Sequence, residues 1–323
     1  MKYDVIGIGN AIVDVITKAD DAFIQEHGLA KGSMRLIDAR QASDLYERMR
    51  PGQETSGGSV ANTCAGVASF GAKVAYVGRV ARDQLGEVFA HDIMAAGVDF
   101  LRSSGDASGP PTARCLVLVT PDAQRTMNTY LGACVELGPD DINAEDFENA
   151  QVTYLEGYLW DPPSAKEAML KAANAARAAG RKVALSLSDA FCVDRHRTSF
   201  QELIDQYVDV LFANEAELLS LTQCETFEAA AAAIVGRAEW IVVTRGALGS
   251  TVITSEGIKT VQAAPVARLV DTTGAGDLYA AGFLYGYTRG CSAEECARLG
   301  SLAAAEIISH YGARPEVQLS TLL

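Results

Sequence analysis

Short apolar runs alternate with alanine-rich stretches along most of this 323-residue chain, and this alternation restricts the fold more than any other feature. The apolar runs have the length of buried strands, whereas the alanine-rich stretches are typical of helices. The predicted strands are residues 5–6, 73–77, 152–155, 183–187, 210–212, 240–244 and 251–254, and the predicted helices include 164–179, 229–237 and 293–309. This order indicates an α/β fold, in which helices cover both faces of a large, mostly parallel sheet.

Short half-polar segments interrupt this pattern at residues 32–38, 112–119 and 125–131, and a turn signal at 120–123 joins the last two. We expect them to form a small β-sheet lid that closes over a site and excludes water, although an ordinary edge hairpin would show the same periodicity. The predicted large domain comprises residues 1–11, 39–98 and 132–323, and the predicted discontinuous lid comprises 12–38 and 99–131.

Charge and composition restrict the partners. The net charge is −14 and the chain has no run of Lys and Arg, so we expect neither nucleic acid nor a membrane surface as a partner, and a neutral substrate is favoured. No apolar run reaches membrane-spanning length, and the N-terminal residues are typical of a strand rather than a secretory leader. Seven cysteines without a CxxC pair suit the reducing cytoplasm, and the four histidines show no metal-binding spacing.

The segment 271–277, Asp-Thr-Thr-Gly-Ala-Gly-Asp, follows an apolar run at 266–270 that is predicted to be a strand and precedes a predicted helix at 278–287. Free backbone N–H groups at a helix N-terminus attract anions, and glycines let the backbone approach a ligand closely. A carboxylate at such a site has a chemical purpose if it takes a proton from an attacking hydroxyl. Asp277 is therefore a candidate base, with helix capping as the alternative.

Further polar groups occur where strands end and helices begin. Asn10 and Asp14 follow the first strand, at the edge of the sheet where ligands bind in open α/β folds, and the Asp14 carboxylate could accept hydrogen bonds from neighbouring sugar hydroxyls. A second group comprises Gly57, Gly58, Ser59 and Asn62, in which glycines before a helix would expose N–H groups and Asn62 would face the same site. Loop capping and a solvated helix start are the alternatives for the two groups.

Two segments in the second half of the chain resemble nucleotide-binding elements. Asn214 and Glu217 share one face of a first helical turn and are oxygen ligands suited to Mg²⁺ or its waters, although they also fit a capping box. Residues 244–249 contain a glycine turn that fits either a nucleotide site or a hairpin loop. A dinucleotide oxidoreductase is disfavoured because Ile12 stands where the glycine fingerprint needs glycine, and Arg114 on the lid is a candidate basic group.

Two separate segments carry a family resemblance: residues 57–86, which run from Gly-Gly-Ser-Val-Ala-Asn to Gly-Arg-Val-Ala-Arg-Asp-Gln-Leu-Gly, and the segment 271–277. In this order they resemble the signatures of the PfkB, or ribokinase-like, family of carbohydrate and nucleoside kinases. The resemblance implies a large α/β domain with a small β lid, Asp277 as the base, and an anion hole formed by the amides of Gly274, Ala275 and Gly276. A helix N-terminus should keep Asp277 ionised at neutral pH.

The resemblance also implies a nucleotide site and its metal. ATP would bind beside residues of the second half of the chain, namely Asn214, Thr244, Gly246, Gly249 and Ser301. Asn214 and Glu217 match the Asn-x-x-Glu motif that holds Mg²⁺ through water in this family. Asp271, Thr273 and Gly312 are placed as a monovalent cation site, for example for K⁺, would require.

Within the family, residues 9–14, 185–191 and 211–217 resemble the adenosine kinase branch, which acts in purine salvage. This similarity implies that the ribose is bound by Asn10, Asp14, Gly57, Gly58, Ser59 and Asn62. It also implies that the base is walled by Phe191 and residues around Tyr130, Leu131 and Cys134, with Met34 on the lid beside it. Met34 stands where related kinases have a glutamine, which removes a polar contact to the base. A sugar kinase and a non-catalytic nucleoside-binding protein remain alternatives, and the lid edge could form a homodimer.

Overall fold

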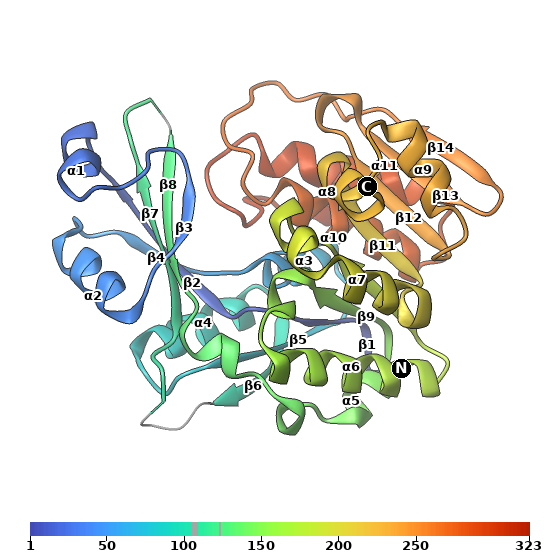
Figure 1. Cartoon of the computed structure of the whole chain (residues 1–323), viewed down its shortest axis with the longest axis horizontal. Helices are drawn as coiled ribbons and strands as arrows, with labels where there is room; N and C mark the ends of the chain where they lie inside the picture. Colours follow the sequence, from blue (N-terminus) through green and yellow to red (C-terminus); the bar gives the residue numbers. More distant parts are fainter. Residues whose placement is uncertain (105–108, 123) are drawn as a thin grey trace.

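The computed structural model describes residues 1–104, 109–122 and 124–323 and contains a large and a small β-sheet (Figure 1). The large sheet has the strand order β14-β13-β12-β11-β10-β9-β1-β5-β6. Its strands are β1 (Tyr3–Ile8), β5 (Val74–Val80), β6 (Val98–Ser104), β9 (Ala150–Glu156), β10 (Lys182–Ser186), β11 (Val210–Asn214), β12 (Trp240–Thr244), β13 (Ser250–Thr254) and β14 (Gly257–Val261). Neighbours from β12 to β6 are parallel, and β13 and β14 add an antiparallel edge.

Helices cover both faces of the large sheet, as the sequence predicts. The helices are α3 (Ser59–Ser69), α4 (Gln84–Ala95), α5 (Ala144–Glu148), α6 (Pro163–Ala178), α7 (Ala190–Tyr207), α8 (Glu215–Thr222), α9 (Phe227–Ile234), α10 (Ala275–Thr288) and α11 (Ala293–Ile307). Successive side chains of a strand point to opposite faces. Val5 of β1 therefore packs in the core beneath α3, α10 and α11, whereas Ile6 and Ile8 pack in the core beneath α5 to α9.

The small sheet stands to one side of the large body and has the order β3-β8-β7-β2-β4 (Figure 1). Its strands are β2 (Ile12–Lys18), β3 (Met34–Leu36), β4 (Gln53–Gly57), β7 (Ala113–Val119) and β8 (Arg125–Tyr130), and α1 (Asp21–Glu26) and α2 (Ala39–Arg48) lie on its outer side. Sheet membership differs from the expected boundaries at two strands. β4 belongs to the small sheet although residues 39–98 were assigned to the large domain, and β6 belongs to the large sheet although 99–131 were assigned to the lid.

Two further predictions have different outcomes. Residues 266–270 do not form a strand, because this segment runs beside helix α11 rather than along the edge of a sheet. The N–H of Val270 donates to the carbonyl oxygen of Ile308, and the N–H of Ala264 donates to Ser301 Oγ at 2.7 Å. The turn predicted at 120–123 includes residue 123, which lies outside the described residues. Among the described residues, no helix is long and apolar enough to cross a membrane.

Close contact between α10 and α11 fixes the helix that begins at the 271–277 segment. A Cβ atom on Gly282 would lie 2.3 Å from the carbonyl oxygen of Leu299, and this backbone atom cannot move without shifting α11. We expect Gly282→Val to lower the free energy of unfolding by about 1–3 kcal/mol or more, measured by urea denaturation. Ala178→Val, at an exposed position of α6, is the control for the helix propensity of valine alone. Equal losses in both variants would contradict the packing argument.

Candidate active site

The N-termini of α3 and α10 meet at Asp277, which lies in the first turn of α10. Ser59 Oγ donates to Asp277 Oδ1 at 2.6 Å, and Asn62 Nδ2 donates to Oδ2 at 2.9 Å. Each helix begins after a glycine with positive φ, +97° at Gly58 and +77° at Gly274, a conformation that residues with a side chain rarely adopt. The structure therefore brings the two sequence motifs together around one carboxylate.

The charge state of Asp277 depends on opposing effects. Burial raises the pKa of Asp277, whereas the hydrogen bonds from Ser59 and Asn62 and the charge of Arg314 lower it. The net direction is upward, so the helix N-terminus alone does not set this pKa as the sequence argument expected, because removal from water outweighs it. The Asn62 Oδ1 atom beside this carboxylate is buried and has no hydrogen-bond partner, which leaves an unused acceptor next to Asp277.

The predicted ribose-binding residues lie around the same turn. A Cβ atom on Gly57 would lie 2.5 Å from Asp14 Oδ2, so the Asp14 carboxylate rests against the glycine backbone. Burial raises the pKa of Asp14 to about 6. Asn10 is buried, and its Nδ2 donates to Glu156 Oε1 at 2.6 Å, while the N–H of Val60 donates to Glu156 Oε2 at 3.0 Å. Asn10 is thus held in place by a carboxylate that sequence reasoning missed.

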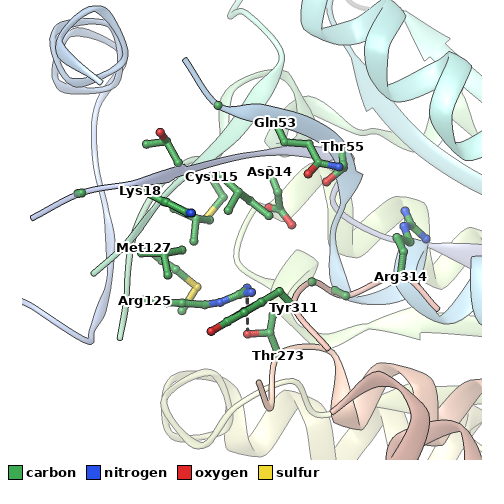
Figure 2. Close-up of a pocket in the computed structure, with 18 of the residues that line it drawn as sticks. Asp14, Lys18, Gln53, Thr55, Cys115, Arg125, Met127, Thr273, Tyr311 and Arg314 are labelled. Carbon is green, nitrogen blue, oxygen red and sulfur yellow. Dashed lines mark hydrogen bonds between the residues drawn. The ribbon is translucent and has the colours of Figure 1, made fainter. Parts of the chain in front are cut away.

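A pocket of about 1140 Å³ opens between the small sheet and the C-terminal segment 311–316 (Figure 2). Asp14 lies in its wall, and Arg125 and Arg314 reach it from opposite sides. The other labelled lining residues are Lys18, Gln53, Thr55, Cys115, Met127, Thr273 and Tyr311. The pocket therefore combines an acidic group for hydroxyls with several cations, in a chain whose overall charge is negative.

Asp271, Thr273 and Gly312, the predicted monovalent cation site, do converge, but around an arginine. Arg125 Nη2 lies 2.5 Å from Asp271 Oδ2, and Arg125 Nη1 lies 3.4 Å from Thr273 Oγ1. The Asp271 carboxylate also accepts hydrogen bonds from the N–H and hydroxyl of Thr273 and from the N–H of Gly312. Four donors thus surround this carboxylate, and the cation beside it is the guanidinium group of the lid.

The predicted anion hole is only partly free. The N–H of Ala275 donates to the carbonyl oxygen of Thr272 at 3.2 Å, as in an ordinary turn. Gly274 is the N-cap of α10, and Gly276 lies within its first turn. The N–H groups of a first turn point out of the N-terminal end of the helix and have no acceptor within it. A Cβ atom on Gly276 would meet nothing within 4 Å, so the space in front of this backbone is open.

The predicted nucleotide residues lie at the carboxyl edge of the large sheet. Asn214, which ends β11, pairs in register with Thr244, which ends β12. Asn214 and Glu217 form a capping box, and burial raises the pKa of Glu217 to about 7. Gly246 and Gly249 form the turn into β13, whereas Ser301 of α11 accepts a hydrogen bond from Ala264.

The fit to a metal ion can be judged from these donors. Both side chains of the Asn214–Glu217 pair are used in the capping box, with Asn214 N donating to Glu217 Oε2 at 2.9 Å. Across residues 1–104, 109–122 and 124–323, no group of three or more His, Cys, Asp or Glu side chains could hold a metal ion. The pair therefore fits a metal held through water rather than a direct protein cage.

The residues predicted to wall the base do not line the pocket. Met34 is 47% exposed on the edge strand β3, and Phe191 is 76% exposed in the first turn of α7. Tyr130, at the end of β8, is half-buried outside the pocket. Arg114 was predicted to supply a basic group, but its guanidinium contacts α2, where Nη2 donates to Ser43 Oγ at 2.9 Å.

Sequence reasoning missed Glu156, Arg125 and Arg314. Glu156 ends β9, so the rule that polar groups at the carboxyl edge of a parallel sheet bind ligands would have found it. Arg125 begins a predicted lid strand and Arg314 follows the predicted Gly312 site, but nothing local distinguishes either from an ordinary surface arginine. What distinguishes Arg125 and Arg314 is that the residues to which they bond lie far away in the sequence.

The buried Glu156 carboxyl should make stability depend on pH. Burial raises the pKa of Glu156 from 4.5 to about 7, although the hydrogen bonds from Val60 and Asn10 oppose this shift. Between these values the unfolded chain has lost this proton and the folded chain retains it, so stability falls as pH rises. The contribution is on the order of 3 kcal/mol across this window.

Glu156→Gln removes this titration. We therefore expect the difference in melting temperature, variant minus wild type, to become more positive from pH 5 to pH 8, as measured by differential scanning fluorimetry without ligand. Glu148→Gln, which removes an exposed carboxylate, is the matched control and should show a constant difference. A difference for Glu156→Gln that does not change with pH would rule out titration of this group.

Comparison with known proteins agrees with this geometry. The sequence matches the pfkB family of carbohydrate kinases over residues 32–319. The crystal structure of adenosine kinase from Sinorhizobium meliloti is 52% identical, covers 100% of this chain and 98% of its own, and superposes with a TM-score of 0.91. A probable sugar kinase from Rhizobium etli CFN 42 is 49% identical, with 99% and 97% coverage and a TM-score of 0.92.

A curated relative with lower identity carries the name of a different kinase. The 5-dehydro-2-deoxygluconokinase of Shouchella clausii is 26% identical over 96% of this chain and 91% of its own length. The fold predicted from the sequence, a ribokinase-like α/β domain with a second small sheet, is confirmed by the two solved structures. The chain belongs to the pfkB family of carbohydrate kinases and is itself a kinase of this family.

Proposed function

We propose that this kinase phosphorylates the primary hydroxyl of adenosine with ATP and releases AMP and ADP. The observation that carries this proposal is the Asp277 carboxylate, held by Ser59 and Asn62 at the helix start and next to a free acceptor on Asn62. The 52% identity to the adenosine kinase of Sinorhizobium meliloti supports adenosine over other acceptors. Asp14, beside the Gly57 turn, is placed to accept hydrogen bonds from the two ribose hydroxyls.

The chemistry follows from these positions. Asp277 takes the proton of the acceptor hydroxyl, whose oxygen forms a bond to the γ-phosphorus while the bond from that phosphorus to the bridging oxygen of ADP breaks. The N–H groups at the start of α10, around Gly274 and Gly276, stabilise charge on the transferred group. Asn62 and Asp14 orient the acceptor, and closure of the small sheet would exclude water.

ATP and Mg²⁺ are the cofactors of this proposal. ATP would lie along Asn214, Thr244, Gly246, Gly249 and Ser301, at the carboxyl edge of the large sheet. Glu217 would hold Mg²⁺ through water, and the metal would neutralise phosphate charge. Burial raises the pKa of Glu217, and a bound cation would lower it again by favouring the ionised carboxylate.

A sugar is the second candidate acceptor, because the residues predicted to wall a base lie outside the pocket. Lys18, Arg125 and Arg314 bring cations to the lining, whereas the predicted aromatic and apolar wall of the base lies outside it. Relatives described as a probable sugar kinase and a 5-dehydro-2-deoxygluconokinase agree with this alternative. A non-catalytic nucleoside-binding protein is a weaker alternative because Asp277 and the glycine turn are intact.

Three earlier expectations stay predictions. K⁺ activation would require the ion to displace Arg125 from Asp271, and equal rates in Na⁺ and K⁺ would argue against it.

A homodimer through the lid would use the β3 edge, where Leu36 is 59% exposed, and sedimentation would decide its existence. A cytoplasmic location agrees with seven cysteines that are all free, and fractionation of cells would test it.

The proposal is tested by ADP release from Mg-ATP with a panel of acceptors: adenosine, guanosine, inosine, cytidine, ribose, fructose and 2-keto-3-deoxygluconate. We expect adenosine to give the highest kcat/KM. Preferred turnover of a free sugar would retain the kinase mechanism and overturn the acceptor. Ligand binding without ADP release for every acceptor would favour the non-catalytic alternative.

Asp277→Asn should abolish most turnover while the protein remains folded, because the variant keeps the shape of the side chain but cannot take a proton. We expect kcat to fall by about 10² to 10⁴-fold, with the KM for ATP little changed. Asp44→Asn, at an exposed position on α2, is the matched control and should retain full activity. A rate near that of wild type in Asp277→Asn would exclude this residue as the base.

A further inference from the structure

Arg314 contacts the backbone on both sides of the Gly57–Gly58 turn. Its Nε and Nη2 donate to the carbonyl oxygen of Ser56 at 3.1 and 3.0 Å, and Nη1 donates to the carbonyl oxygen of Ala61 at 2.6 Å. Nη2 also donates to Ser56 Oγ at 2.8 Å. A planar guanidinium group can make this set of contacts, whereas the single ammonium group of a lysine cannot.

The turn that Arg314 spans determines the position of Asp277. Ser59, which follows this turn, donates to the Asp277 carboxylate, and a Cβ atom on Gly58 would lie 2.2 Å from the carbonyl oxygen of Asn10. A displacement of this turn would therefore change both the bond from Ser59 to Asp277 and the close contact between Gly58 and Asn10. Asp92 of α4 holds the same turn from the other direction, since Ser56 N and Oγ donate to its Oδ2 at 2.7 and 2.6 Å.

The neighbour of Arg314 reaches the second glycine turn. A Cβ atom on Gly274 would lie 3.0 Å from the Cβ of Ala313, so the C-terminal segment packs directly against the N-cap of α10. Residues 313 and 314 thus contact the start of α10 and, through Ser56 and Ala61, the start of α3. Figure 2 shows Arg314 approaching the pocket from this segment, on the side away from Arg125.

The charge of Arg314 acts on two carboxylates of the site. Burial raises the pKa of both Asp14 and Asp277, and Arg314 opposes this rise in each case. The charged and titratable groups that act together with Asp277 or Asp14 are Arg125, Arg314, Cys115, Tyr154, Tyr158 and Glu156, besides these two carboxylates themselves. Arg125 acts on Asp14, so Arg314 is the cation that acts on Asp277 in this set.

We propose that Arg314 is a positioning residue for the phosphoryl-transfer reaction, which fixes the Gly57–Gly58 turn against Asp277. This inference rests on the proposed kinase reaction at Asp277 but holds for a nucleoside or a sugar acceptor. Arg314 acts through Ser56 and Ala61 and through its charge, and takes no part in bond making.

Two substitutions separate the geometric effect from the charge. Arg314→Lys keeps the positive charge but loses the planar guanidinium group that bonds Ser56 and Ala61 together. We therefore expect the acceptor KM to rise by about tenfold or more, while the ATP KM stays within about twofold. The acid limb of the pH profile of kcat/KM should stay in place. Arg314→Met also removes the charge. Loss of this cation raises the carboxylate pKa values, so the acid limb should move upward by about one pH unit.

Arg237→Lys is the matched control, because Arg237 also bonds a backbone carbonyl and a carboxylate, Gln201 and Asp205, away from the site. It should show wild-type kinetics. A lower melting temperature in both Arg314 variants, with wild-type acceptor KM and acid limb, would show a merely structural role and overturn the proposal. If Arg314→Met does not fold, the KM pattern of Arg314→Lys decides.

Failure of the proposed function has a different signature, namely wild-type protein without turnover on any acceptor of the panel. The proposal on Arg314 is then tested without substrate, by ¹³C NMR titration of the Asp277 carboxyl group in the free protein. A higher Asp277 pKa in Arg314→Met than in Arg314→Lys supports the charge effect, and equal values in the two variants overturn it.

Discussion

The contact between the first turns of α3 and α10 is the constraint on which the rest of the site depends. Two helix N-termini carry partial positive charge and would repel each other if they faced one another without an anion between them. Asp277 supplies this anion, and Ser59 and Asn62 of α3 bond to it. Close approach also requires small residues, since a Cβ atom on Gly66 of α3 would lie 2.6 Å from the Cβ of Ala281. The base is therefore also a structural link between the two helices.

This arrangement buries several acidic groups together, at a cost in stability. Burial raises the pKa values of Asp14, Glu156 and Asp277, so each ionised form is disfavoured by removal from water. Arg314 and the backbone N–H of Val60 offset part of this cost. Raised carboxyl pKa values of this kind are common at functional sites, where a carboxyl group must exchange a proton near neutral pH. Glu156 differs from Asp14 because its hydrogen bonds come from Asn10 and Val60 of the protein, whereas Asp14 faces the pocket.

Local sequence patterns predicted the strands of the large sheet other than β6 and β14, and the two glycine turns, because strand periodicity and the use of glycine at sharp turns are properties of short segments. That Asp14, Gly57 and Asp277 belong to one site was implied by the family resemblance and not by these local patterns. The strand predicted at residues 266–270 was wrong, because this run stays largely exposed, with Leu269 64% exposed, and it has no buried strand position to fill. Arg314 escaped prediction because its partner, Ala61, lies 253 residues away in the chain. No local pattern encodes such a contact.

The lining of the pocket indicates how an acceptor would be selected. Strands β7 and β8 contribute Cys115, Val117 and Met127, and burial raises the pKa of the Cys115 thiol to about 12, so this part of the lining is neutral and apolar beside the charged Arg125. Such a surface contacts a flat ring without reading its edges, and it discriminates weakly between similar bases. Asp14, in contrast, presents a carboxylate that is left unpaired by an acceptor without the matching hydroxyls. We therefore expect this site to select an acceptor more by its sugar hydroxyls than by the base attached to the sugar.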